Sequence, residues 1–144
     1  MNKQLKNLIW DECTRHDRYI HIPGIYRHFK QTKNHEDMIY AVSNISIPID
    51  ESQDDFFREI FVSSETDFVS FYHTELEEDV ILLKHKGNYY HHCSYDSEKL
   101  VIYTALYGYR ESYVRPLSMF ISKVDKVKYK DSKQKYRFEL VCTA

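Results

Sequence analysis

The stretch VILLKHKGNYYHHCSYDSEKLVIYTALY, residues 80–107, decides the expected fold. Apolar, β-branched and aromatic residues, which are enriched in strands, gather there in three short runs at residues 80–85, 88–95 and 100–107. Lys86-Gly87-Asn88 and Tyr95-Asp96-Ser97-Glu98 separate these runs and contain the residue types that form tight turns. The stretch therefore predicts three consecutive strands joined by turns.

Similar patterns on either side of this stretch predict further strands. The same composition recurs at residues 25–30, 38–47 and 68–72. Pro48 is expected to end the second of these strands, because proline cannot donate to a sheet. Val114–Ile121 is predicted as the last core strand, with Pro116 at an edge or a bulge. Together the strands predict a mainly β domain, a small barrel-like and strongly bent antiparallel sheet that is SH3-like in style.

Two helices are expected beside the strands. Residues 2–16 form an amphipathic pattern, in which one helical face carries Leu5, Leu8, Ile9 and Cys13. Residues 52–62 predict a short helix, because apolar side chains recur at helical spacing at Phe56, Phe57, Ile60 and Phe61. A strand through residues 60–62 is the competing interpretation of this second segment.

The length of 144 residues predicts a single domain over residues 1–144. Its expected parts are an N-terminal helix within 1–22, a β domain over 24–121 with an acidic insertion at about 48–86, and a basic C-terminal extension over 122–144. The core is expected to bury Tyr26, Phe29, Val101, Tyr103, Leu106, Val114, Leu117 and Phe120.

Cysteine usage and hydropathy favour a cytoplasmic protein. The three cysteines, Cys13, Cys93 and Cys142, are odd in number and give no disulfide framework. The first residues do not resemble a secretory signal, and no apolar run approaches the ~20 residues that span a bilayer. We therefore expect a cytoplasmic location and no membrane partner.

Charge is distributed unevenly, although the net charge is only −2. Residues 50–79 hold eleven acidic side chains and one basic one, Arg58. Residues 123–137 hold seven basic side chains and two acidic ones, Asp125 and Asp131. Blocks of like charge are typical of interaction segments. Two interpretations stay open: the basic tail binds a partner, or it folds onto the acidic middle of its own chain.

Four segments resemble a bacterial family known as domain of unknown function 1653. They follow one another in the family's order: GIYRHFK at 24–30, VIYTALYG at 101–108, YVRPLSMF at 113–120 and QKYRFEL at 134–140. The resemblance implies a small bacterial domain without an assigned activity. It also implies a shorter spacing between the first two segments than this chain has, so that residues 31–86 contain either a degenerate internal repeat or an insertion.

Arginine and histidine within these segments are candidates for anion binding. Arg27, His28 and Arg115 are polar positions among apolar ones, and a pair of arginines is a natural clamp for carboxylate or phosphate. The alternative is a structural ion pair of Arg115 with Glu98 or Glu111. The basic tail adds four further anion-binding candidates: Lys128, Lys130, Lys135 and Arg137. Aromatic residues alternate with these cations, as in proteins that bind nucleic-acid backbones.

Metal binding and catalysis have little support in the sequence. Cys13 and His16, with His91 and Cys93, form a weak candidate set for zinc, but such spacings arise by chance and we expect no metal and no cofactor. There is no glycine-rich phosphate loop and no catalytic motif, so no catalytic residue is predicted. Tyrosines at 89, 90, 103, 107, 109 and 113 suit a stacking platform for bases less well than a core.

The sequence therefore favours a non-catalytic binding module for an anionic partner, either nucleic acid or an acidic protein segment. The alternative is a small-molecule enzyme or ligand sensor that uses Arg27, His28 and Arg115. Oligomeric state is not indicated by any of these patterns.

Overall fold

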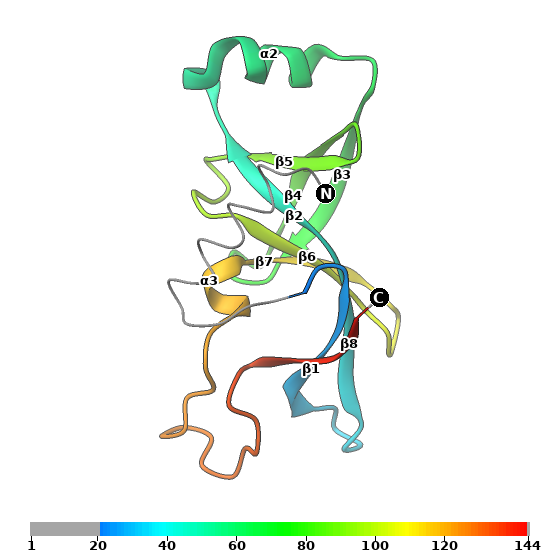
Figure 1. The fold of residues 1–144 in the computed structure, drawn as a ribbon, viewed down its shortest axis with the longest axis vertical. Helices are drawn as coiled ribbons and strands as arrows, with labels where there is room; N and C mark the ends of the chain where they lie inside the picture. The colour runs from blue at the N-terminus through cyan, green and yellow to red at the C-terminus, as the bar shows by residue number, and fades with distance from the viewer. Residues whose placement is uncertain (1–20, 144) are drawn as a thin grey trace.

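The computed structural model describes residues 21–143 (Figure 1). The helix expected at residues 2–16 lies outside these residues. The elements in chain order are β1 (Gly24–Gln31), β2 (Asp37–Ile49), η1 (Glu51–Gln53), α2 (Asp54–Val62), β3 (Thr66–His73), β4 (Glu78–His85), β5 (Asn88–His92), β6 (Leu100–Ala105), β7 (Ser112–Pro116), α3 (Leu117–Phe120) and β8 (Phe138–Thr143).

Six of the strands close into a β-barrel, which confirms the predicted mainly β, barrel-like fold. The barrel order is β5-β4-β3-β7-β6-β2, and a parallel pairing of β2 with β5 joins its ends. β1 and β8 extend the sheet beyond β2. Most neighbours are antiparallel, but β3 and β7 are also parallel. Closure satisfies the backbone groups that an open sheet edge would leave unpaired.

β2 makes this arrangement possible because it serves two parts of the sheet. Its first half, around Ile39–Val42, pairs with β1, and its last residues, Ser46–Ile49, pair with β5. An irregularity between Val42 and Asn44 interrupts its pairing with β6, as a bulge does where a strand bends. Pro48 does not end β2, because the strand continues to Ile49 in the parallel pair with β5.

The core has three clusters. One lies between β1, β2, β6, β8 and α3 and includes Tyr26, Tyr103, Phe120 and Phe138. A second is built from alternate residues of β4, β6 and β7, and a third lies under α2, where Ile60 is only 1% exposed. Of the predicted core, Leu106 is the exception at 47% exposure; β6 ends one residue earlier. Phe29 is half-buried, and the other six are buried.

The segment Val114–Ile121 is not one strand, contrary to the prediction. β7 ends at Pro116, and α3 follows at Leu117–Phe120. Proline has no backbone N–H with which to continue a ladder and fits the start of a helix. The short helix buries Leu117 and Phe120 on one face, so these residues reach the core by helical spacing. The predicted helix at residues 52–62 is confirmed, as α2.

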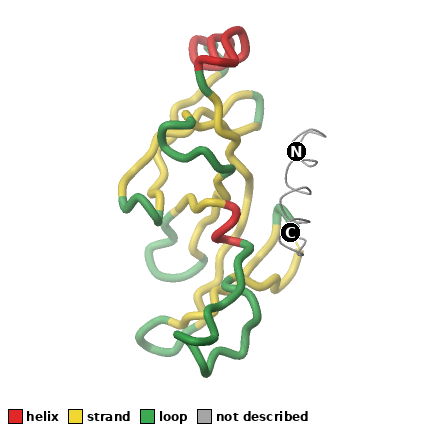
Figure 2. The backbone as a smooth tube through the Cα atoms, turned by 90° about the vertical axis from the view of Figure 1, so that its left-hand side faces the viewer, coloured by secondary structure: helices red, strands yellow, loops and turns green. Residues whose placement is uncertain are grey.

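The acidic and basic segments both contribute to the sheet. The acidic segment 48–86 supplies β3 and β4, two of the six barrel strands. The basic segment 122–144 forms a loop and then β8, which pairs with β1. Figure 2 shows α2 at one end of the molecule and the loop before β8 at the other. Among the described residues, no helix has the length and apolarity needed to cross a bilayer.

Candidate anion-binding groove

The loop between α3 and β8, residues 122–137, carries the basic cluster and is held together by its own hydrogen bonds. Its two arms are joined by backbone hydrogen bonds from Val124 N to Lys135 O (2.9 Å) and from Arg137 N to Ser122 O (3.0 Å). The Lys126 ammonium donates to the carbonyl oxygens of Ser132 (2.5 Å) and Gln134 (2.7 Å). Lys126 therefore holds the loop together from within, which leaves other lysines to face outward. We call residues 122–137 the basic loop.

The basic loop is anchored to β1. Phe29 N donates to Arg137 O at 2.9 Å, and Arg27 Nε donates to Gln134 Oε1 at 2.9 Å. The Gln134 side chain returns a hydrogen bond to Arg27 O at 3.3 Å. These contacts position the basic loop beside the β1–β2 hairpin, so that lysines from two distant parts of the sequence share one surface.

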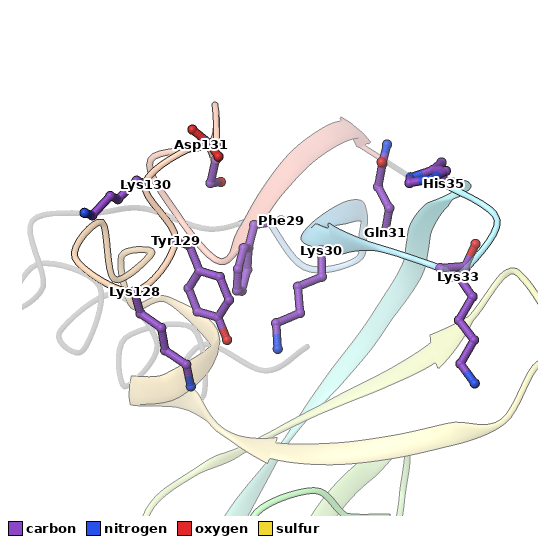
Figure 3. A pocket seen from close by; sticks show the side chains of 11 residues that line it. Phe29, Lys30, Gln31, Lys33, His35, Lys128, Tyr129, Lys130 and Asp131 are labelled. Carbon is purple, nitrogen blue, oxygen red and sulfur yellow. The ribbon is translucent and has the colours of Figure 1, made fainter.

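A groove of about 600 Å³ lies between the basic loop and the β1–β2 hairpin (Figure 3). Four lysines line it: Lys30, Lys33, Lys128 and Lys130. Asp131 is the one carboxylate in its lining. All five charged side chains are exposed. The groove is therefore open to solvent and mainly cationic, a combination that attracts anionic polymers. We call it the basic groove.

Phe29 and Tyr129 form the aromatic part of the basic groove. Their ring centroids are 4.8 Å apart in a T-shaped arrangement. The ammonium groups of Lys30 and Lys128 lie 5.1 and 5.4 Å from the Tyr129 centroid. In Figure 3 these two lysines extend in the same direction as the Tyr129 ring. The hydrogen bond with Lys30 is the largest of the influences that lower the pKa of Tyr129. Aromatic and cationic groups thus lie side by side in the basic groove.

A second hollow, of about 520 Å³, continues the basic groove. It is lined by Arg27, His28 and Lys133, and it shares Phe29 and Asp131 with the basic groove. The two hollows therefore form one band along residues 27–31 of β1. Arg27 faces this band while its neighbour Tyr26 is buried, which agrees with the alternation of a strand.

Arg115 and Arg137 belong to a different, interior cluster. The Arg115 guanidinium lies 5.1 Å from the ring centroid of Phe138 and donates from Nε to Thr74 Oγ1 at 3.2 Å. Among residues 21–143, its buried Nη1 atom has no hydrogen-bond partner. Burial, followed by the positive charge of Arg115, lowers the pKa of Arg137. Two cations therefore share a partly buried place next to Phe138.

His28 lies on the same side of β1 as this interior cluster. Its ring is 4.8 Å from that of Phe138, and its Nδ1 accepts a hydrogen bond from Lys30 N at 3.1 Å. Burial, and then the charges of Arg115, Arg137 and Lys30, lower the pKa of His28 to about 3. His28 is thus neutral at physiological pH and adds no charge to the surface.

The predicted anion-binding residues are divided between these places. Lys128 and Lys130 line the basic groove, and Arg27 and His28 line its continuation. Arg115 and Arg137 lie inside, and Lys135 lies outside both hollows with its ammonium 5.4 Å from the Tyr136 ring. Arg27 and Arg115 do not form a pair, because Arg115 contacts Phe138 on the face of β1 opposite to Arg27. Within the described residues, Arg115 makes no ion pair with Glu98 or Glu111.

Sequence reasoning missed Lys30, Lys33 and the role of Phe29. Phe29 and Lys30 belong to the strand predicted at residues 25–30, and Lys33 lies outside every predicted strand. Their shared signal is the cationic and aromatic composition of residues 29–33. That signal points to a groove only once the basic loop is known to lie beside it.

The acidic and basic ends of the molecule are well separated. In Figure 1, α2 lies at the top of the longest axis and the basic loop at the bottom. The basic loop therefore does not lie against α2, which is one part of the acidic middle at residues 50–79. One acidic residue is closer, because the charge of Glu75 acts on Arg137. An anion that approaches the basic groove consequently does not meet the acidic helix.

The weak metal set is only partly within the described residues, since Cys13 and His16 lie outside them. His91 uses both ring nitrogens: Nδ1 is 2.7 Å from Ser46 Oγ, and Nε2 is 3.0 Å from the carbonyl oxygens of Asp96 and Glu98. Cys93 Sγ is 3.6 Å from Asp50 Oδ2. No group of three or more metal-binding side chains occurs in residues 21–143.

The tyrosines that were considered as a stacking platform for bases do not share one surface. Tyr90 and Tyr103 lie in the core, whereas Tyr109 is 97% exposed.

Comparison with known proteins gives one match. Residues 84–140 match the model of a family described as "Protein of unknown function (DUF1653)". Three of the four resembling segments, at 101–108, 113–120 and 134–140, lie within the match, and the segment at 24–30 lies outside it. The match begins at Lys84, within the stretch Leu83-Lys84-His85-Lys86, which is similar to Tyr26-Arg27-His28-Phe29-Lys30. No curated protein and no solved structure matches the chain.

Proposed function

We propose that this chain, a member of the DUF1653 family through residues 84–140, is a non-catalytic module that binds single-stranded nucleic acid in the basic groove. One observation carries the proposal. Four exposed lysines surround the aromatic pair of Phe29 and Tyr129 in a groove of about 600 Å³. Cations bind a phosphate backbone, and aromatic rings bind bases without regard to their sequence.

A single strand fits this groove better than a duplex does. The described helices near the groove are limited to the four residues of α3, too short for a recognition helix in a major groove. A single strand presents its bases freely to the half-buried Tyr129 ring. Stacking of a base on Tyr129 would move Lys30 or Lys128 from the ring to the neighbouring phosphate. Lys30 and Lys128 therefore already lie close to the expected position of that phosphate.

Binding of a labelled oligothymidylate or oligouridylate tests the proposal. Fluorescence anisotropy would compare the intact chain with Lys128→Ala/Lys130→Ala. The matched control is Lys123→Ala/Lys135→Ala, which removes two exposed lysines of the same loop that do not line the groove. We expect the groove variant to lose at least tenfold in affinity and the control less than threefold. With four phosphate contacts, log Kd should rise with log salt with a slope of about 3.

Two results would overturn the proposal. One is a complete lack of binding at low salt. The other is an equal loss in the groove variant and in its control, which would indicate diffuse attraction to the basic loop. Binding of polyglutamate in place of the oligonucleotide, lost in the same groove variant, would assign the groove to an acidic protein segment.

A small-molecule enzyme or ligand sensor is the second candidate, and one observation favours it. Within the described part of the chain, the buried Nη1 of Arg115 has no hydrogen-bond partner. Such a group costs free energy unless a water or an anion accepts its hydrogen bond. Arg137 and His28 lie close to it, whereas Arg27 does not. Stabilisation against heat by millimolar phosphate or carboxylates, lost in Arg115→Met, would support a small-anion sensor. Equal melting temperatures with and without these anions would exclude it.

We also propose a cytoplasmic location. Cys93 and Cys142 are both unpaired, and Cys142 is exposed. Free exposed thiols suit a reducing compartment. Cell fractionation tests the location, and recovery of the protein outside the cytoplasm would contradict it.

A further inference from the structure

The opposite end of the molecule carries an apolar groove. This groove, of about 560 Å³, lies between α2, the outer face of β3 and β4, and the loop after β5. Its apolar lining includes Phe57, Phe61, Phe68, Ile81 and Leu83. None of its lining residues belongs to the basic groove. We call it the apolar groove.

Strand register explains why these side chains share one face. In the β3–β4 pair, Phe68 lies opposite Leu83, and Ser70 lies opposite Ile81. Residues that are directly opposite, or two apart on one strand, point to the same side of a sheet. That side is outside the barrel, because Val80 and Leu82, the neighbours of Ile81 on β4, belong to a core cluster.

Helix α2 covers this face incompletely. Ile60 is 1% exposed and closes the third core cluster with Leu83. Phe61 and Phe68 instead remain 51% and 56% exposed, with their ring centroids 5.9 Å apart. Ile81 is 47% exposed beside them. Three large apolar side chains therefore lie together in contact with water, which is typical of an interaction surface.

The charge around the apolar groove indicates the kind of partner. Glu51 lines the groove with a side chain that is 71% exposed, and its described partner is His92 at 2.9 Å. Exposed acidic residues on and after α2 add Asp55, Glu59 and Glu65. Arg58 is the single basic residue in the whole segment 50–79. A partner in this groove would gain electrostatic attraction if it carried lysine or arginine.

From these observations we propose that the apolar groove binds a cationic amphipathic segment of another protein. Apolar side chains one helical turn apart would enter between Phe61, Phe68 and Ile81, and a flanking lysine or arginine would reach Glu51. A second copy of the chain fits less well, because a symmetric contact would bring two acidic rims together. The chain's own basic loop is excluded by its place at the far end of the molecule (Figure 1).

The proposal is tested with a labelled amphipathic peptide of leucine and lysine, titrated with the full chain. The variant Phe61→Ser/Phe68→Ser removes exposed apolar surface and leaves the core intact. Its matched control is Leu76→Ser/Val127→Ser, because these residues are 43% and 84% exposed and lie outside the apolar groove. We expect at least a tenfold loss of affinity in the groove variant and less than a twofold change in the control.

A second variant separates charge from apolar contact. Glu51→Gln should weaken the peptide severalfold at low salt and have little effect at high salt, whereas Glu36→Gln, an exposed residue of the β1–β2 turn, should change nothing. Replacement of the peptide's leucines by serine should abolish groove-dependent binding. Thermal unfolding of each variant shows that the fold is retained.

Three outcomes would overturn the proposal: no binding of the leucine–lysine peptide, equal affinity of groove and control variants, or equal affinity for the serine peptide. Self-association that is lost in Phe61→Ser/Phe68→Ser would assign the apolar groove to a second copy instead. The proposed function is tested separately, since Lys128→Ala/Lys130→Ala should leave peptide binding unchanged.

Discussion

Phe29 of β1 and Tyr129 of the basic loop meet edge to face, with ring centroids 4.8 Å apart. This contact joins an element at the start of the described chain to one near its end. Each ring brings a lysine, because Lys30 follows Phe29 and Lys128 precedes Tyr129. The aromatic contact thereby fixes the spacing of two cations, which then lie 5.1 and 5.4 Å from the Tyr129 centroid.

Replacement of the uncharged Tyr129 should weaken the binding of single-stranded nucleic acid, although it leaves the charge of the basic groove unchanged. Loss of one stacked base costs about 1–3 kcal/mol, so Tyr129→Ala should raise Kd by roughly tenfold or more without changing the slope of the salt dependence. Tyr109→Ala is the control, because Tyr109 is 97% exposed and lies outside the groove. Anisotropy titrations at three salt concentrations measure both quantities. An unchanged Kd in Tyr129→Ala would show that Tyr129 does not stack on a base and that the lysines account for the binding.

Phe120 should be the most costly single truncation in the core. It is fully buried, and its ring stacks on Phe138 with centroids 4.4 Å apart. Phe120→Ala should lower the free energy of unfolding by about 3–5 kcal/mol. Leu106→Ala, at a site that is 47% exposed, should cost less than about 1 kcal/mol. Urea denaturation compares the two, and similar losses would contradict the assignment of Phe120 to the core.

The strands could be predicted from the sequence because local alternation of apolar residues suffices to identify them. The closure of the barrel could not, because the parallel pairs β2–β5 and β3–β7 join segments that are far apart in the chain. The helix α3 was missed for a local reason: its four residues, LSMF, are as apolar as the strand before them. Pro116 was the available signal, and it marks the end of β7 rather than a bulge.

Two of the four lysines that line the basic groove could be predicted from the sequence. Lys128 and Lys130 were identified from the density of charge around them, which is a local property. Lys30 and Lys33 become groove residues only through the hydrogen bonds that hold the basic loop to β1, such as that from Arg27 Nε to Gln134 Oε1. Arg115 shows the opposite case. The sequence predicts it as part of an anion clamp, yet its guanidinium packs against the buried ring of Phe138.

Removal of the Arg115 charge should raise the pKa of His28. Burial is the largest cause of the low value of about 3, and the charge of Arg115 is the next. In Arg115→Met the pKa should therefore rise but remain below 6.5. Arg27→Met is the control, because Arg27 lies on the other face of β1 and is not among the causes of the shift. Titration of the imidazole signals by NMR measures both variants. An unchanged pKa in Arg115→Met would show that the two side chains do not interact.

Acid should begin to lower the free energy of unfolding at pH values well above those at which carboxylates titrate. Burial lowers the pKa of His28 to about 3 and, as its largest cause, that of His91 to about 4. In the unfolded chain both groups have a pKa near 6.5, so the unfolded state takes up protons first as the pH falls. The free energy of unfolding should therefore be fully present above pH 6.5 and decline below it, by about 1.4 kcal/mol per pH unit for each histidine.

Urea denaturation at pH 7.5, 6 and 5 measures this decline. With both histidines contributing, the slope below pH 6 should approach roughly 2–3 kcal/mol per pH unit. His28→Gln removes one titrating group and should reduce that slope by about half. His35→Gln changes an exposed histidine of the β1–β2 turn and should leave the slope unaltered. A midpoint that stays constant between pH 7.5 and 5 would mean that His28 and His91 remain free to accept protons in the folded protein, which their burial at 7% and 0% exposure argues against.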